Sequence, residues 1–189
     1  GPTHIAADIG CHSFSTFEPF SFGHSILGYG MSLASRAGVS PMMKRRVLSI
    51  MGDGGFWHNG LTSGIANAVV NRDDAILVVM ENGYTSATGT QNIPSSQHQA
   101  AEKMTGMSIE RALKGVGVEW VKRVTTYQVA EVAKTLKEAM TTPFAGLKVI
   151  IADSECQLER QRRIRPLIAA SLKAGERVVR TRFGVDEDT

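Results

Sequence analysis

Short apolar runs alternate along the chain with segments of helical period. Each run is rich in β-branched residues and too short for a helix, which favours strands. The five runs are residues 4–9, 47–51, 75–80, 119–124 and 147–152. The helical stretches between them are residues 25–37, 60–71, 108–115 and 127–140. This alternation predicts an α/β, three-layer sandwich in which a mostly parallel, five-stranded sheet carries helices on both faces.

Composition argues against a membrane-spanning protein, a secreted protein and a fold built on disulfides or zinc. The 189 residues contain no apolar run long enough to span a bilayer and no secretion signal, so we expect a cytoplasmic protein without a membrane partner. The two cysteines, Cys11 and Cys156, are far apart and lack metal-ligand spacing. Neither a disulfide framework nor a zinc or iron–sulfur site built by this chain is expected, and any metal would be held mainly by oxygen.

The excess positive charge lies in one tail. Residues 157–182 carry eight Lys and Arg against two acids, whereas residues 1–156 carry thirteen of each. We therefore divide the chain into a domain at residues 1–154 and a basic, helical extension at residues 155–189. An arginine-rich tail could bind nucleic acid, but no aromatic residue is interleaved for base stacking, which favours a solvated or partner-facing helix. The chain starts at Gly1 and stops in an acidic stretch, so we expect both ends to continue in a longer protein, with a further segment downstream of the extension.

Candidate binding residues come directly after two of the predicted strands, at the strand ends where parallel sheets bind ligands. One strand is followed by Gly52-Asp53-Gly54-Gly55, and the next by Glu81-Asn82-Gly83. Glycines at a strand-to-helix turn let backbone N–H groups approach a phosphate. The aspartate would repel that phosphate unless a divalent cation lay between them. The sequence does not match the dinucleotide-binding motif G-x-G-x-x-G, because Trp57 stands in place of its third glycine.

The spacing supports a cation. One helix and one strand separate Asp53 from Asn82, so both side chains emerge at the same sheet edge if the two strands are neighbours. A carboxylate and an amide oxygen suit Mg²⁺, with a backbone carbonyl, diphosphate oxygens and water completing six ligands. The alternative is that the two segments form only tight turns.

Asp53-Gly54 with Asn82 at this spacing resembles the thiamine-diphosphate binding motif. The longer segments 8–12, 52–60, 82–91 and 155–163 resemble indolepyruvate ferredoxin oxidoreductases, a branch of the 2-oxoacid:ferredoxin oxidoreductases. The resemblance spans nearly the whole chain and implies the diphosphate-side, thiamine-diphosphate-binding domain. Thr90 and residues 92–96 depart from the histidine-containing segment expected there, so the substrate stays open.

The resemblance also implies roles for individual residues. The Mg²⁺ ligands would be Asp53, Asn82 and the main-chain carbonyl of Tyr84. Further residues would contact the cofactor, with Leu27 or Ile26 bending it: Gly10, Gly52, Gly54, Gly55 and Thr85. Cys11 would lie near the thiazolium and His58 would approach the substrate, although each could instead have a packing or capping role.

The function implied by the resemblance is oxidative decarboxylation of a 2-oxoacid, such as an aryl pyruvate, to an acyl-CoA. The thiamine diphosphate and Mg²⁺ would bind here, while iron–sulfur clusters, CoA, ferredoxin and a pyrimidine-binding domain would involve other segments or subunits. The isolated chain is therefore expected to be inactive. The alternatives are a non-oxidative thiamine-diphosphate decarboxylase or carboligase, and a non-catalytic assembly domain.

The N-terminal region has an unusual density of aromatic residues. Phe14, Phe17, Phe20 and Phe22 fall within nine residues, close to Leu27. Exposed apolar surface of this kind marks interfaces, so we expect another domain or subunit there and a homo-oligomer in solution. The alternative is that these rings cover the domain's own helix.

Overall fold

The computed structural model describes residues 3–96 and 106–179. The chain divides into two units, residues 1–156 and residues 157–189. The first unit holds the whole sheet and the candidate site. The second contains helix α6 (Gln157–Lys173), which includes Pro166 and buries none of its side chains. No helix among the described residues is both long and apolar enough to cross a membrane.

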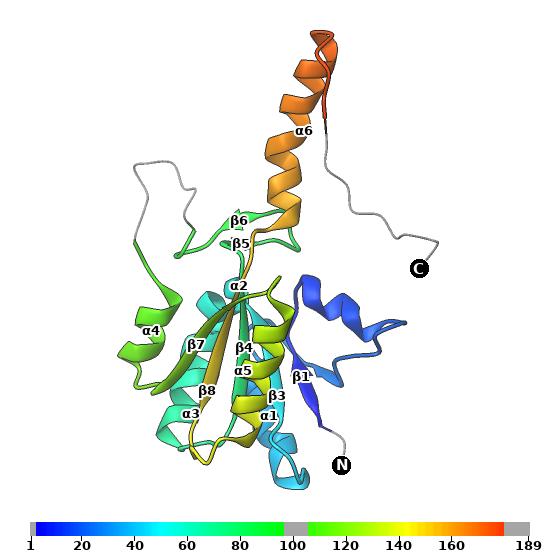
Figure 1. Ribbon diagram of the computed structural model, residues 1–189. Coiled ribbons are helices and arrows are strands. Elements are labelled where there is room, and N and C mark those ends of the chain that lie inside the picture. Colours follow the sequence, from blue (N-terminus) through cyan, green and yellow to red (C-terminus); the bar gives the residue numbers. More distant parts are fainter. Residues whose placement is uncertain (1–2, 97–105, 180–189) are drawn as a thin grey trace. The chain divides into compact units, whose positions relative to one another are not determined.

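A six-stranded parallel sheet forms the centre of the first unit (Figure 1). Its order is β2 (Ser25–Ile26), β1 (Ile5–Ala7), β3 (Leu48–Gly52), β4 (Ile76–Glu81), β8 (Lys148–Asp153) and β7 (Trp120–Thr125). A separate antiparallel hairpin pairs β5 (Tyr84–Thr85) with β6 (Gln91–Asn92). The α/β class and the parallel sheet are therefore confirmed.

The predicted count of five strands was wrong by one. Residues 25 and 26, expected at the start of a helix, form the edge strand β2, and the helix α1 (Ser32–Val39) begins later. Gly30 separates the two because it adopts a φ of 78°. A Cβ at Gly30 would also lie 2.6 Å from the carbonyl oxygen of Gly55, so only glycine fits this crossing.

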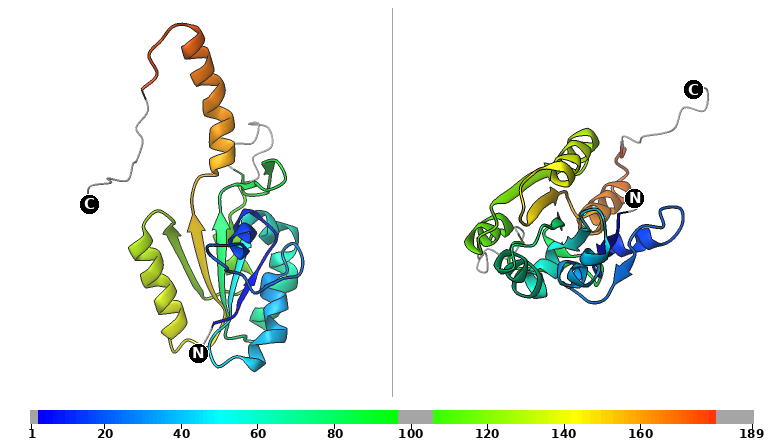
Figure 2. Two further views of the ribbon diagram at one scale, coloured as in Figure 1. Left: turned by 90° about the vertical axis from the view of Figure 1, so that its right-hand side faces the viewer. Right: turned by 90° about the horizontal axis from the view of Figure 1, so that it is seen from below.

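Helices cover both faces of the sheet, and each face has its own core (Figure 2). On one face, Leu33 of α1, Ile65 at the end of η3 (Phe56–Ile65) and Leu113 of α4 (Ile109–Gly115) pack against the strands. On the other face, Leu136 of α5 (Val129–Thr141) and the half-buried Phe22 pack against the sheet. The two cores make the predicted three-layer sandwich.

A continuous helical run follows β3. It consists of α2 (Asp53–Gly55), the π-helical segment η3 (Phe56–Ile65) and α3 (Ala66–Val70). The helix was expected to begin at residue 60, but it starts at Asp53 directly after the strand. A glycine-rich sequence is typical of a turn, yet Gly54 and Gly55 adopt helical geometry in α2. Asp53 is thus placed at a helix start, where the backbone carries a partial positive charge.

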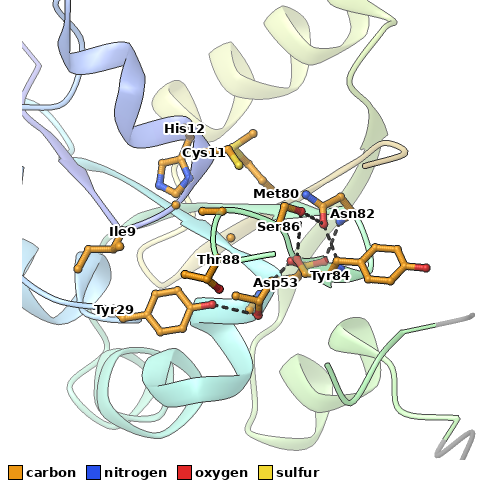
Figure 3. Close-up of a pocket in the computed structure, with 15 residues that line it drawn as sticks. Ile9, Cys11, His12, Tyr29, Asp53, Met80, Asn82, Tyr84, Ser86 and Thr88 are labelled. Atoms are coloured by element: carbon orange, nitrogen blue, oxygen red, sulfur yellow. Dashed lines mark hydrogen bonds between the residues drawn. The ribbon is translucent and has the colours of Figure 1, made fainter. Parts of the chain in front are cut away.

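The remaining helical turns are short. They are η1 (Cys11–Thr16), which follows β1, and η2 (Ser40–Met42), which follows α1. The turn η1 carries Cys11 and His12 to the same end of the sheet as the start of α2 (Figure 3).

Candidate functional site

The site lies at the carboxyl ends of β3 and β4. These strands are parallel neighbours, and Gly52 pairs with Met80 at their ends. Asp53 follows one strand and Asn82 follows the other, so the structure brings together the two residues that the spacing predicted at one sheet edge. Adjacent parallel strands place such residues together without any further interaction between their side chains.

The Asp53 carboxylate is buried and surrounded by backbone N–H groups. Its side chain is 1% exposed, and Oδ2 accepts hydrogen bonds from the amides of Asn82 at 2.7 Å and Gly83 at 2.6 Å. Its Oδ1 accepts one from the amide of Gly54 at 2.9 Å. Burial raises the pKa of Asp53 from 3.8 to about 6, although these amides oppose the shift. A bound cation would favour the charged carboxylate.

Asn82 presents its side-chain oxygen to the same turn. Its Oδ1 accepts hydrogen bonds from the amide of Tyr84 at 3.1 Å and the hydroxyl of Ser86 at 3.2 Å. The hydroxyl of Ser86 also lies 3.1 Å from Sγ of the buried Cys156. These contacts fix the orientation of the Asn82 amide, with its oxygen held beside the backbone of Tyr84.

The donor set fits Mg²⁺ in its chemistry. Asp53 supplies a carboxylate, Asn82 an amide oxygen and Tyr84 a main-chain carbonyl, all of them the hard oxygen ligands that this ion prefers. Within residues 3–96 and 106–179, no three His, Cys, Asp or Glu side chains cluster in a metal-binding arrangement. A cation at this sheet edge would therefore depend on the mixed oxygen donors.

Gly54 shapes the floor of the site. A Cβ at this position would overlap the hydroxyl groups of Tyr29 and Thr85, which lie 3.3 Å from each other. Its amide donates to Asp53 rather than pointing freely outward. Gly54 thus contributes the space into which Tyr29 and Thr85 fit, in addition to the backbone donor that the sequence suggested.

Asp8, which sequence reasoning missed as a site residue, holds the other side of this floor. It is fully buried at the end of β1, and both carboxylate oxygens lie 2.8 Å from the amide of Gly30. A Cβ at Gly55 would lie 2.8 Å from Oδ2 of Asp8. Burial raises the pKa of Asp8 from 3.8 to about 6. Its position directly after an apolar strand was the available signal.

A pocket of about 180 Å³ opens above these residues (Figure 3). Eight of the predicted site residues line it: Gly10, Cys11, Gly52, Asp53, Gly54, Asn82, Tyr84 and Thr85. These residues come from the ends of β1, β3 and β4 and from the hairpin strand β5. The structure therefore gathers most of the predicted set around one cavity.

Three predicted residues lie elsewhere. Leu27 is 75% exposed and is not among the residues lining the pocket, and its predicted alternative, Ile26, pairs with Ala7 in the sheet. Gly55 faces Asp8 beneath the floor. His58 is exposed, and its ring packs against Tyr29 with centroids 5.0 Å apart.

Sequence reasoning also missed several pocket residues. They share no motif and come from separate segments: Ile9, His12, Tyr29, Met80, Ser86, Ala87 and Thr88. Three of them, Ile9, His12 and Ser86, adjoin a predicted residue in the sequence, so proximity to a predicted residue was a usable signal for these. Tyr29 lacked such a signal, because the turn before α1 brings it to the site only in the folded chain.

Comparisons with known proteins agree with this geometry. Residues 8–151 match the family described as "Thiamine pyrophosphate enzyme, C-terminal TPP binding domain". Subunit IorA of the indolepyruvate oxidoreductase of Methanothermobacter thermautotrophicus is 30% identical over 152 residues, covering 80% of this chain and 24% of the relative. IorA of Archaeoglobus fulgidus is 29% identical over 159 residues, 84% of this chain and 25% of the relative. The chain thus spans about a quarter of these relatives.

A solved structure shares the fold. The 2-oxoglutarate:ferredoxin oxidoreductase of Magnetococcus marinus, determined with 2-oxoglutarate, coenzyme A and succinyl-CoA bound, superimposes with a TM-score of 0.66 at 20% identity. The alignment covers 82% of this chain and 55% of that one. The family match covers most of the first unit and includes every predicted metal ligand. The chain therefore belongs to the family of C-terminal thiamine-pyrophosphate-binding domains of thiamine pyrophosphate enzymes.

Proposed function

We propose that this chain is the diphosphate- and Mg²⁺-binding part of a thiamine-diphosphate-dependent 2-oxoacid:ferredoxin oxidoreductase, with an aryl pyruvate as substrate. The observation that carries the proposal is the meeting of Asp53 and Asn82 at the ends of two neighbouring strands, above a helix start. The similarity to IorA subunits of indolepyruvate oxidoreductases supports the oxidative reaction and the aryl substrate.

Different residues of the site would bind the metal ion and the diphosphate. Asp53, Asn82 and the carbonyl of Tyr84 would hold Mg²⁺, which would in turn hold the diphosphate. Gly54 leaves room for the hydroxyls of Tyr29 and Thr85 beside the start of α2, whose partial positive charge favours an anion there. When bound, thiamine diphosphate supplies the carbon nucleophile that decarboxylation of a 2-oxoacid requires.

The rest of the enzyme would lie in other segments or subunits. The chain spans about a quarter of its IorA relatives, so there is ample room in a longer protein for a pyrimidine-binding domain and for iron–sulfur clusters. Coenzyme A and ferredoxin would be partners of that complete enzyme. The isolated chain would bind the cofactor without turning over 2-oxoacids.

Calorimetric titration of thiamine diphosphate, with and without Mg²⁺, tests the proposal. Asp53→Ala removes the one charged side chain among the three proposed ligands and should weaken Mg²⁺-dependent binding at least a hundredfold while leaving the fold intact. Asp153→Ala is the matched control, because this carboxylate ends β8 and pairs with Arg123 at 2.9 Å outside the pocket. Equal affinity of the wild-type and Asp53→Ala chains would refute the proposed site.

Calorimetry of this chain, together with an activity assay of the complete enzyme, separates the competing functions. A non-catalytic assembly domain would not bind the cofactor at all. A non-oxidative decarboxylase would use the same Asp53 and Asn82, but the complete enzyme would release an aldehyde without reducing an artificial electron acceptor. Acceptor reduction that depends on both a 2-oxoacid and coenzyme A would support the oxidative reaction.

A further inference from the structure

His12 lines the pocket but belongs to no part of the proposed metal or diphosphate site. It lies on the turn η1, and in the view of Figure 3 its ring lies above the pocket while Asp53 lies below. The nearby wall is formed by Ile9, Gly10 and Cys11, which offer no strong side-chain hydrogen-bond donor. His12 is thus the polar side chain at this end of the cavity.

The backbone fixes the tautomer of this histidine. Nε2 of His12 accepts a hydrogen bond from the amide of Asp8 at 3.3 Å, so this nitrogen carries no proton. Burial lowers the pKa of His12 below its ordinary 6.5, which keeps the ring neutral at pH 7. The single ring proton must then reside on Nδ1. Asp8 is itself held by Gly30, so the donor to His12 is rigidly placed.

The Nδ1–H group is available to a ligand. Within residues 3–96 and 106–179, no group accepts a hydrogen bond from it. Several hydroxyls of the pocket, in contrast, are engaged: Tyr29 with Thr85, Ser86 with Asn82 and Thr88 with Gln91. Gly10 keeps the Nδ1 side of the ring uncovered, because a Cβ at that position would lie 3.1 Å from Nδ1.

The pocket has no cation for an acidic substrate. Among the residues that line it in the described part of the chain, none is Lys or Arg. A 2-oxoacid brings a carboxylate into this largely apolar cavity, and that carboxylate needs a hydrogen-bond donor at the end away from Asp53. A neutral imidazole N–H meets this need, and a hydrogen bond to a charged group contributes more than one between neutral groups.

We propose that His12 is a substrate-binding residue whose Nδ1–H donates a hydrogen bond to the carboxylate of the 2-oxoacid. This inference rests on the proposed function, because it takes the ligand of the pocket's upper end to be a 2-oxoacid. It adds a specificity element supplied by this chain itself, at a residue that no part of the metal-binding motif includes.

Two substitutions test the roles of the two ring nitrogens separately. His12→Gln places an amide near Nε2, so it can still accept from the amide of Asp8 but has no donor at the Nδ1 position. His12→Asn places its amide nitrogen near Nδ1 and restores the donor. His24→Phe is the control, because the ring of this histidine also accepts a backbone amide, that of Ile5 at 3.0 Å, but does not line the pocket.

The first measurement is the tautomer of His12 in the full chain at pH 7.5, from two-bond ¹H–¹⁵N correlation spectra. We expect protonated Nδ1 and unprotonated Nε2. The second is titration of phenylpyruvate into the chain loaded with thiamine diphosphate and Mg²⁺. His12→Gln should raise the Kd for phenylpyruvate about tenfold, as expected for loss of a hydrogen bond to a charged group. His12→Asn should stay within about threefold of wild type, and His24→Phe should match it.

The outcomes distinguish this inference from the proposed function. A chain that fails to bind thiamine diphosphate and Mg²⁺ overturns both. Normal cofactor binding with equal phenylpyruvate affinity in wild type and His12→Gln overturns the role of His12 alone, as does a protonated Nε2 or a loaded wild-type chain that binds no phenylpyruvate. The tautomer is measured on the wild-type chain, so a misfolded variant leaves the inference open to refutation.

Discussion

The pocket has two contrasting walls. The lower wall, which is the floor formed where β3 and β4 end, is closed by hydrogen bonds. The N-terminal wall, formed by residues 9–12 with the segment that follows, is largely open. In the lower wall, three backbone amides converge on the Asp53 carboxylate. Behind the N-terminal wall, Phe14, Phe17 and Phe20 are 69%, 68% and 74% exposed. Ile9 itself is 48% exposed.

This difference indicates which part of the binding site the chain completes by itself. The lower wall needs no other domain, because its donors and acceptors satisfy one another. The N-terminal wall exposes apolar side chains that water solvates poorly, as interfaces do before their partner is bound. We propose that another domain or subunit covers this wall, as the pyrimidine-binding domain implied by the resemblance would.

The largest expected effect would come from filling the lower wall. Gly54→Ala places a methyl group against the hydroxyls of Tyr29 and Thr85, so it should cost about 3 kcal/mol of unfolding free energy. Gly52→Ala is the matched control, because no atom lies within 4 Å of the position that its methyl group would take and its φ is −77°. Chemical denaturation of the cofactor-free chains measures both. Equal stability of the two variants would show that the lower wall is loosely packed.

A smaller effect concerns the charge of the lower wall. Folding raises the pKa of Asp53 to about 6, so the folded chain holds that proton more tightly than the unfolded chain. The contribution of Asp53 to stability is therefore greatest below about pH 4 and is lost as the pH rises through about 6. The unfolding free energy of wild type relative to Asp53→Asn should increase by about 1 kcal/mol between pH 7 and pH 5 without metal, since one pKa unit equals about 1.4 kcal/mol.

Glu110→Gln provides the control for this pH dependence. The hydrogen bond from Lys114 lowers the pKa of Glu110 below 4.5, so its titration lies outside the window from pH 7 to pH 5. The stability difference between wild type and Glu110→Gln should stay constant over that window. A constant difference for Asp53→Asn as well would mean that Asp53 stays ionised throughout, and that the amides outweigh its burial.

The smallest change in unfolding free energy is expected at the N-terminal wall. Replacing Phe14, Phe17 and Phe20 together by Ser should weaken self-association about tenfold in sedimentation experiments and leave the unfolding free energy within about 1 kcal/mol. Phe22→Ser should instead cost about 3 kcal/mol, because the half-buried Phe22 packs into the core. If the triple variant associates like wild type, the exposed rings are not the interface.

The sequence by itself determined the alternation of strands and helices, the parallel sheet and the meeting of Asp53 and Asn82 at one sheet edge. It could do so because buried strands are continuous apolar runs, and because parallel neighbours place whatever follows them at one edge. The two proposed metal ligands were therefore predictable from positions far apart in the chain. Glycine content gave less guidance: Gly54 and Gly55 suggested a turn, although they begin a helix.

Only the tertiary structure decided the rest of the pocket. The two-residue strand β2 is too short for any period, and the 75% exposure of Leu27 had no signal in the sequence. Tyr29 reaches the pocket through a crossing that depends on the missing side chain of Gly54. Such crossings are set by close packing between segments distant in sequence, which no local pattern of apolar and polar residues encodes.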